Sequence, residues 1–237
     1  AGDYRRFWTT TSLRGLIGAT LKVEVLTEGV HSGGASGHVP SSFRIARQLL
    51  SRIESEKTGE ILLDELKTEI PDYRLKETEE FVSVLGDEVV EEFPWKETME
   101  PSSSDNVEGV LRRTWRPALS VVGADGLPPS ANAGNVLRPF TQLQLSMRIP
   151  PMVDPIKAQE AMRKALTENP PYNARVTLYF EEGASGWNAP ETKPWLSKAM
   201  NKYSKVFFKE PSGSLCEGGT IPFMAMLGEQ FPKAQFV

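Results

Sequence analysis

The feature that most constrains the fold is a stretch of strict alternation that runs from Phe140 to Ile149. Apolar and polar positions take turns along it: Leu143, Leu145, Met147 and Ile149 against Gln142, Gln144, Ser146 and Arg148. Successive side chains of a β-strand point to opposite faces of a sheet, so the pattern predicts a strand with one buried and one polar face. Such a strand needs neighbouring strands and a layer that covers its apolar face.

Other segments supply those neighbours. Residues 20–26 and 175–180 also alternate, and residues 118–122 form a short strand candidate. One helix is indicated after Ser41 or Ser42 and another after Asp154-Pro155, where a capping side chain precedes an apolar stripe or a first-turn proline. The order strand, helix, strand, strand, helix, strand is that of the ferredoxin-like fold, an antiparallel sheet with two helices on one face.

The distribution of charge and the sequence pattern divide the chain into further segments. Between Glu54 and Glu100 acids greatly outnumber bases, although the whole chain carries a net charge of only −4. We interpret residues 60–110 as an acidic insertion in the ferredoxin-like unit, which spans residues 18–182. Residues 1–17 and 183–237 are interpreted as parts of an incomplete α/β domain. The fold class is therefore α+β with α/β flanks.

The α/β interpretation of residues 183–237 rests on four elements: a helix over 191–203, a strand-like 206–208, a helix over 221–230 and a terminal strand over 235–237.

Composition excludes several classes of protein. The single cysteine, Cys216, rules out an internal disulfide framework, and two histidines rule out a histidine-rich metal site made by this chain alone. No apolar run approaches the roughly 18–20 residues of a membrane span, and Ala1–Thr11 lacks a signal-peptide core. We expect a cytoplasmic setting and no membrane partner. The five tryptophans are not interleaved with a basic run, which argues against nucleic acid.

The loop Glu217-Gly218-Gly219-Thr220 is one candidate site. Its glycines would let the backbone approach a ligand closely, Thr220 can cap a helix that opens at Ile221-Pro222, and a helix start attracts anions such as carboxylates. Glu217 would then be placed to bind an amine. An ordinary strand–turn–helix connection fits the same residues.

His31 opens a second candidate, a loop rich in glycine and serine. A histidine at a strand end can donate a hydrogen bond to an oxyanion, but a surface-loop histidine has the same composition. Arg148 suits a carboxylate or a surface salt bridge, and Asn135 suits the same site or a turn. Cys216 has no base nearby in sequence and is interpreted as a packed residue.

Four motifs in order carry a family resemblance: Thr10-Thr11-Ser12-Leu13-Arg14-Gly15, Val30-His31-Ser32-Gly33, Ser146-Met147-Arg148 and Glu217-Gly218-Gly219-Thr220-Ile221-Pro222. The chain resembles the M20-family metallopeptidases, in particular their carnosinase-like dipeptidase branch. The similarity runs through most of the chain and is weakest over 60–110. One departure is Cys216, where many relatives have arginine before the Glu-Gly-Gly motif.

The resemblance implies a fragment of a two-metal dipeptidase: the dimerisation lid with adjoining catalytic-domain segments. It implies that His31 reaches into the partner subunit's active site and stabilises the tetrahedral intermediate there. Arg148 would bind the substrate C-terminal carboxylate, assisted by Asn135. Glu217, Gly218, Gly219 and Thr220 would hold the substrate termini.

The family's metal ligands are missing from this chain: most would lie before Ala1 and the last after Val237. We therefore expect two zinc or manganese ions only in a full-length parent, and an isolated chain that is inactive. A dipeptide substrate and a homodimer through the lid complete the hypothesis. The alternative is a self-contained small-molecule-binding or assembly module without hydrolytic activity.

Overall fold

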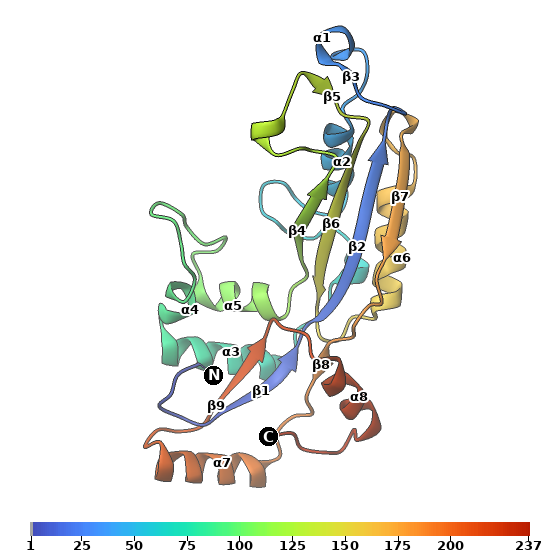
Figure 1. The fold of residues 1–237 in the computed structure, drawn as a ribbon. Coiled ribbons are helices and arrows are strands. Elements are labelled where there is room, and N and C mark those ends of the chain that lie inside the picture. Colours follow the sequence, from blue (N-terminus) through green and yellow to red (C-terminus); the bar gives the residue numbers. More distant parts are fainter. Residues whose placement is uncertain (1) are drawn as a thin grey trace.

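The computed structural model describes residues 2–237 and has mixed α and β structure (Figure 1). The strands are β1 (Trp8–Leu13), β2 (Gly15–Glu24), β3 (Val30–His31), β4 (Ala118–Asp125), β5 (Val136–Leu137), β6 (Phe140–Ile149), β7 (Arg175–Phe180), β8 (Trp187–Asn188) and β9 (Gly213–Glu217). The helices are α1 (Ser32–Ala35), α2 (Ser42–Leu50), α3 (Asp72–Leu85), α4 (Glu88–Glu91), α5 (Asn106–Thr114), α6 (Pro155–Thr167), α7 (Pro194–Phe207) and α8 (Pro222–Gln230). Short 3₁₀ turns lie at Asp64–Leu66, Ser130–Asn132 and Pro171–Asn173.

A four-stranded antiparallel sheet in the order β4-β6-β2-β7 forms the upper part of the molecule in Figure 1. Its two central strands, β2 and β6, pair along their whole length, from Gly15 opposite Ile149 to Glu24 opposite Phe140. Strand order and directions are those of a ferredoxin-like sheet, which confirms the predicted fold class. We name this sheet, with α2 and α6, the lid.

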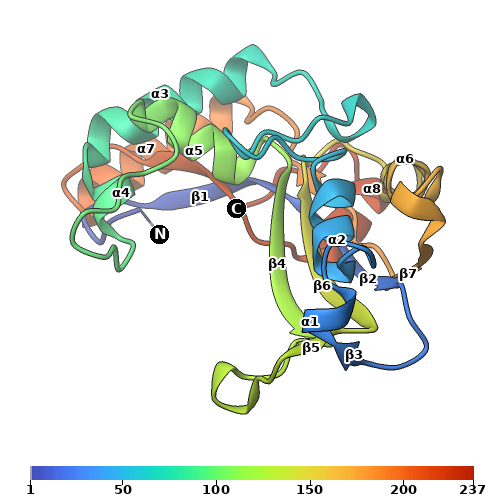
Figure 2. The same ribbon diagram turned by 90° about the horizontal axis from the view of Figure 1, so that it is seen from above.

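Both lid helices cover the same face of the sheet (Figure 2). The apolar positions of β6 are buried, as the alternation predicts, and they pack against Ile45 and Leu49 of α2 and Met162 of α6. The predicted caps are present: the side chain of Ser41 accepts a hydrogen bond from Arg44 N, and that of Asp154 accepts one from Ile156 N. These caps fix where each helix starts, because they satisfy N–H groups that have no partner inside the helix.

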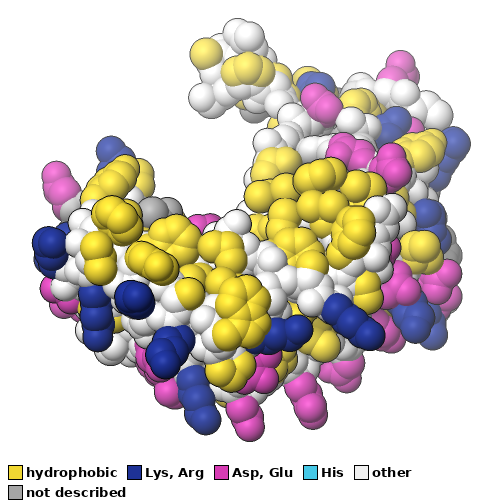
Figure 3. Space-filling model, turned by 90° about the horizontal axis from the view of Figure 1, so that it is seen from below, with side chains coloured by type: hydrophobic (Ala, Val, Ile, Leu, Met, Phe, Trp, Pro, Cys, Tyr) yellow, Lys and Arg dark blue, Asp and Glu magenta, His cyan; other side chains and the backbone are white. Residues whose placement is uncertain are grey.

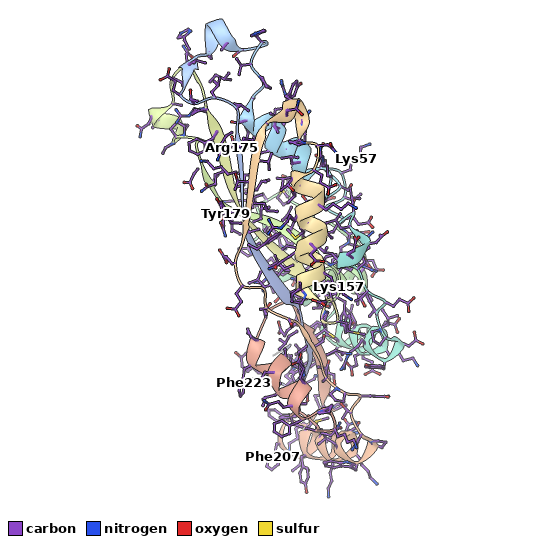
Figure 4. All side chains as sticks on the ribbon, turned by 90° about the vertical axis from the view of Figure 1, so that its right-hand side faces the viewer. Lys57, Lys157, Arg175, Tyr179, Phe207 and Phe223 are labelled. Carbon is purple, nitrogen blue, oxygen red and sulfur yellow. The ribbon has the colours of Figure 1, made fainter. Side chains whose placement is uncertain are left out.

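Figure 4 views the lid from the side of β7, where Arg175 and Tyr179 label the strand and Lys157 labels α6. Arg175 pairs in register with Glu24 of β2, and Tyr179 with Thr20. β7 is therefore one edge strand of the lid sheet, and β4 is the other.

A second, three-stranded sheet in the order β8-β1-β9 forms the lower part of the molecule. β1 separates two helical layers: Trp8 packs edge-on against Phe81 of α3, whereas the neighbouring Thr9 bonds the sulfur of Met200 in α7. Arg74 of α3 is fully buried and donates to Asn188 Oδ1, Glu77 Oε2 and the Ala189 carbonyl. This network joins α3 to the β8 edge of the sheet.

The acidic segment 60–110 supplies part of this lower layer. Phe81, Leu85, Val89 and Val110 form one buried cluster with Leu215 of β9. Helices α3, α4 and α5 therefore pack beside the three-stranded sheet, with most of their acidic side chains directed to solvent. The segment follows the first lid helix in the chain. Its first residues, among them Ile61 and Leu66, pack into the core of the lid, whereas α3, α4 and α5 pack beside the lower sheet. The domain boundaries given above stay a prediction.

Two predicted strands near the C-terminal end are wrong. Val206, Phe207 and Phe208 lie at the end of α7 rather than in a strand. The helix that starts at Pro194 continues through them because Ser204 is buried and accepts a hydrogen bond from Phe7 N, which holds this last turn against β1. Residues 235–237 form no strand; Phe236 instead packs on Trp187.

The lower face also carries many exposed apolar side chains. Figure 3 shows hydrophobic side chains gathered on the side of the molecule where α7 and α8 lie, and Figure 4 labels Phe207 and Phe223 there. Phe207 and Phe223 are each more than half exposed, and so is Trp195 of α7. Helix α8 has no buried residue. Among the described residues, no helix combines the length and apolar character needed to cross a bilayer.

The two sheets meet where the chain crosses itself at Gly15 and Gly186. A methyl group on Gly15 would lie 2.7 Å from the Ala184 carbonyl oxygen, and one on Gly186 would lie 2.6 Å from the Cα atom of Pro151. Real Cβ atoms do not approach backbone so closely, so both positions require glycine for steric room.

We predict that Gly186→Ala lowers the free energy of unfolding by about 1–3 kcal/mol, because the backbone atoms around the methyl group cannot move independently. Urea denaturation followed by circular dichroism measures it. Gly109→Ala is the matched control: Gly109 lies in α5 with open space around its Cβ position, so the change should leave stability unchanged or raise it by up to about 1 kcal/mol. Equal stabilities for the two variants would contradict the steric argument.

Candidate functional site

Two of the sequence-predicted groups come together at the junction of the sheets. Arg148, near the end of β6, donates from Nη1 to Thr220 Oγ1 at 2.9 Å. Thr220 belongs to the loop that joins β9 to α8, so this bond ties the lid to the Glu217–Thr220 loop. Thr220 is not the helix cap that its position suggested: α8 starts after Ile221, without a side-chain capping bond. Its hydroxyl is used for Arg148 instead.

The Glu217–Thr220 loop starts directly at the end of β9. Glu217 is opposite Leu13 in β1, and its carbonyl oxygen accepts from Arg14 N at 3.3 Å. Gly218 lies against the carbonyl oxygen of Arg113, in a space that no Cβ atom could share. Gly219, in contrast, has open space on its Cβ side. The loop is therefore held tightly at Gly218 and is open at Gly219.

Arg14 holds this loop from below. Although it is a charged residue, only 8% of its surface is exposed. Its Nε donates to the Gly218 carbonyl at 3.3 Å, and its Nη1 donates to the carbonyls of Arg112 and Arg116 at 3.4 and 3.3 Å. Burial, with the positive charges of Arg148 and Arg113, lowers the pKa of Arg14 to about 10.

A cavity of about 530 Å³ opens beside this cluster. Arg14, Arg113 and the first three residues of the Glu217–Thr220 loop line it, and so do the acidic Glu88, Glu91 and Glu92. Arg113 bonds Glu92 through Nη1, while its Nε is buried and has no hydrogen-bond partner in the described chain. The cavity lining thus contains both basic and acidic side chains, Glu217 among the acidic ones.

Cys216 is a packed residue, as the sequence indicated. It is buried, and Trp115 Nε1 donates to its sulfur at 3.2 Å. No histidine lies among its contacts in residues 2–237, so the thiol has no base to activate it.

His31 and Asn135 form a second group at the opposite end of the lid. β3 and β5 pair as a two-stranded ribbon, with His31 opposite Val136, and the Asn135 carbonyl accepts from Ser32 N at 2.9 Å. His31 is exposed, and its Nδ1 accepts from Gly33 N at 3.2 Å. A neutral imidazole with Nδ1 as acceptor carries its proton on Nε2, so the outer nitrogen is a free donor.

The length of β6 separates the two groups. Arg148 is eight residues further along the strand than its start at Phe140, which at about 3.3 Å per residue amounts to roughly 26 Å. The ribbon with His31 lies beyond the Phe140 end (Figure 1). His31 and Asn135 therefore cannot contact Arg148 of the same chain. Whether Asn135 assists an arginine of a partner subunit stays a prediction, as do the roles of the other site residues.

The described residues do not form a metal centre. Within 2–237, no three side chains of histidine, cysteine, aspartate or glutamate lie close enough together to hold a metal ion. A metal-binding role therefore does not fit the residues present.

Comparison with known proteins identifies the family. Residues 11–173 match the model of the M20 peptidase dimerisation domain. The chain belongs to the M20 peptidase family. The match extends from within β1 of the lower sheet through most of the lid and ends at the turn before β7. A search of curated protein sequences found no match.

Several solved structures share the fold of this M20 chain. Human carnosine dipeptidase 1 superposes with a TM-score of 0.74 at 17% identity, over 97% of this chain and 49% of that one. The di-peptidase Dug1p of Saccharomyces cerevisiae gives a TM-score of 0.73 at 19% identity, over 96% of this chain and 47% of that one. An M20 family metallo-carboxypeptidase of Sulfolobus solfataricus gives 0.66 at 17% identity, over 92% and 49%. The chain thus spans about half the length of these proteins.

Sequence reasoning found Arg148 and the glycine loop but assigned no role to Arg14. Arg14 lies within one of the family motifs, yet nothing in its neighbours Leu13 and Gly15 distinguishes a buried arginine from an exposed one. Arg113 was missed for a similar reason: it is one basic residue in an amphipathic helix, where solvent exposure is the usual outcome.

Below Arg14, an ion-pair network orders the end of α5. Glu108 accepts from Arg116 at 2.8 and 2.9 Å and from Arg112 Nε at 3.3 Å. The hydrogen bond from Arg116 lowers the pKa of the Glu108 carboxyl group. The network positions the Arg112 and Arg116 carbonyls that receive Arg14.

We predict that Glu108→Gln costs roughly 0.5–1 kcal/mol of stability at pH 7, the range for partly exposed ion pairs. Because the pKa of Glu108 is lower in the folded state, its stabilisation is present above the unfolded pKa and is lost as pH falls through the folded one. The stability difference between wild type and variant, from urea titrations between pH 7 and pH 3, should therefore shrink below about pH 4.5. A difference that stays constant over this range would contradict the assignment.

Proposed function

We propose that this chain forms the dimerisation lid and part of the catalytic domain of a metal-dependent dipeptidase. The observation that carries the proposal is the bond between Arg148 and Thr220, which brings the lid arginine to the Gly218-Gly219 loop at the junction of the two sheets. The fold shared with carnosine dipeptidase 1 and Dug1p supports the same substrate class. Dipeptides have a carboxylate and an amine at a short spacing, which suits an arginine with an acidic residue nearby.

In this proposal, Arg148 binds the substrate C-terminal carboxylate through the donors that Thr220 leaves free. The open side of Gly219 allows a substrate to approach the backbone closely. Glu217, at the end of β9, would receive the substrate amine. All of these groups belong to the same chain and lie where the lid meets the lower sheet.

His31 enters the proposal from a second subunit. Its distance from Arg148 within one chain prevents both from touching one dipeptide. The family model is that of a dimerisation domain, which supports a homodimer. In such a dimer, the free Nε2–H of His31 would reach the partner's site and stabilise a developing oxyanion. Asn135, on the same ribbon, would accompany it.

The zinc or manganese ions of such an enzyme would be held by residues outside this chain, since the described residues do not form a site for them. The solved relatives are about twice as long as this chain, which supports a further catalytic segment. The exposed apolar side chains of α7 and α8 suit contact with such a segment. A cytoplasmic setting completes the proposal.

The first test is the oligomeric state of this chain. We expect sedimentation equilibrium to show a dimer at micromolar concentration that dissociates on dilution, since the lid alone supplies the proposed interface. A monomer throughout the micromolar range would contradict dimerisation through the lid.

The second test is complementation between two inactive variants, made in an enzyme that joins this chain to the metal-binding segment. His31→Ala and Arg148→Ala should each lower metal-dependent dipeptide hydrolysis by roughly 100-fold or more. When the two variants are mixed and exchanged, half of the dimers are mixed, and each of those has one intact site. Activity should therefore recover to about 25% of wild type, as two-fold symmetry dictates.

The matched control mixes Arg148→Ala with Thr220→Ala. Both residues belong to the same chain's half of the site, so every site in the mixed dimer carries one defect and no recovery is expected. Recovery in this control, or its absence in the first mixture, would contradict the assignment of His31 to the partner's site. A wild type without metal-dependent hydrolysis of any dipeptide would favour the binding-module alternative.

A further inference from the structure

A second cavity, of about 740 Å³, opens on the outer face of α5, and we name it the α5 cavity. One side of it is the lid segment after α2, including residues 58–61. The other is the end of α4 with the loop that leads to α5. In Figure 1 this loop rises to the left of α5, and β4 rises to its right. None of the residues proposed for the dipeptide site lines the α5 cavity, and its volume suits a small organic molecule.

Gly109, in the middle of α5, lies on the cavity side of the helix. A Cβ atom there would have no neighbour within 4 Å beyond its own helix backbone and adjoining residues. Asn106, Arg112 and Arg113 lie three or four residues away, on the same helix face, and also line the cavity. Glycine is the poorest helix former apart from proline. The glycine therefore weakens the helix and leaves room for a ligand to approach its backbone.

Two aromatic side chains, Phe93 and Trp95, line the cavity on the side of the α4–α5 loop. Both are about two-fifths exposed, and their rings are in edge-to-face contact with centroids 5.9 Å apart. Trp95 Nε1 donates to the Val90 carbonyl at 2.7 Å, which fixes the indole ring. The guanidinium group of Arg113 lies over Phe93, 5.5 Å from the ring centroid. These contacts hold two apolar rings where a flat ring of a ligand can pack on them.

The lining of the α5 cavity carries a surplus of positive charge. Five basic side chains line it, against three acidic ones, although the surrounding segment is acidic. Three of the basic residues are arginines at the end of α5, and they share two carboxylates. Glu108 pairs with Arg112 and Arg116, and Glu92 pairs with Arg113. One positive charge of this group is therefore left without a carboxylate partner.

Each of these arginines also keeps a terminal guanidinium nitrogen that has no acceptor in residues 2–237. These nitrogens are Nη2 of Arg112, Nη2 of Arg113 and Nη1 of Arg116. Planar guanidinium donors are well suited to carboxylate and phosphate groups. The cavity thus combines unused anion-binding donors with aromatic rings.

We propose that the α5 cavity binds a small aromatic anion. The ring of this ligand packs against Phe93 and Trp95 above Gly109, and its anionic group accepts hydrogen bonds from the free donors of Arg112 and Arg113. A neutral aromatic molecule would leave these donors unused, and an anion without a ring would leave the aromatic side of the cavity unfilled. The site needs no metal ion and no second subunit, so it is independent of the proposed hydrolysis.

The experiment titrates phenylacetate into the 237-residue chain at constant ionic strength and follows the Gly109 amide and the Trp95 indole N–H signals by NMR. Phenylacetamide is the control ligand without the charge, and acetate is the control without the ring. We expect saturable shifts of both signals with phenylacetate. Each control ligand should bind at least about tenfold more weakly, since it lacks one of the two interactions.

Two variants test the position of the site. Gly109→Leu fills the cavity from the helix and replaces a poor helix former by a good one, so it should fold and bind phenylacetate at least about tenfold more weakly. Trp95→Ala should weaken binding in the same direction. Trp195→Ala is the matched control, because Trp195 is an exposed tryptophan of α7 that does not line the cavity. This variant should bind phenylacetate like wild type.

Three outcomes would each overturn the proposal: equal binding of phenylacetamide, undiminished binding in folded Gly109→Leu, and phenylacetate shifts confined to the Gly218 and Gly219 amides. The last would show that the anion binds only beside the dipeptide site. The wild-type signals of Gly109 and Trp95 decide the matter if a variant does not fold. Binding requires no catalysis, so failure of dipeptide hydrolysis and failure of this site are separate results.

Discussion

The crossing of Gly15 and Gly186 is the constraint on which the arrangement of the molecule depends. The two glycines lie against each other: a Cβ atom on either one would be 2.9 Å from the backbone nitrogen of the other. Gly15 begins β2 directly after β1 ends, so the chain passes from the lower sheet to the lid within two residues. Gly186 brings it back. The lid and the lower sheet are therefore joined by two short, closely packed crossings, and Arg14 lies at one of them.

The ferredoxin-like sheet was predictable because its signals are local and agree with each other. Alternation marked β6 and β7, and Ser41 and Asp154 marked the helix starts, so pattern and capping gave one answer. Elements of the lower part were harder to predict, since their conformation depends on distant partners. The run Val206-Phe207-Phe208 has the composition of a strand, but Ser204 and Phe7, far apart in sequence, fix it as the end of a helix.

In the candidate site, too, some residues could be predicted from local sequence and others depend on tertiary packing. Arg148 and the glycine loop could be proposed from motif and residue type, and the structure brings them into contact. What the sequence could not reveal is which charges are buried. Arg14 differs from Arg116 only in its surroundings: the first donates to three main-chain carbonyls from the interior, and the second forms a bidentate pair with Glu108 near the surface. Burial of this kind arises from tertiary packing, which no local pattern records.

In the proposed dimer, the length of the paired strands β2 and β6 sets the distance between Arg148 and the His31 ribbon. Removing two residues from each strand would preserve every inward and outward position, because the side-chain repeat along a strand is two. It would nonetheless shorten the reach of the β3–β5 ribbon by about 7 Å. The hydrophobic core would tolerate such a change, whereas the proposed entry of His31 into a neighbouring subunit would not. Under the proposed function, strand length in this lid is therefore subject to a demand that stability alone does not impose.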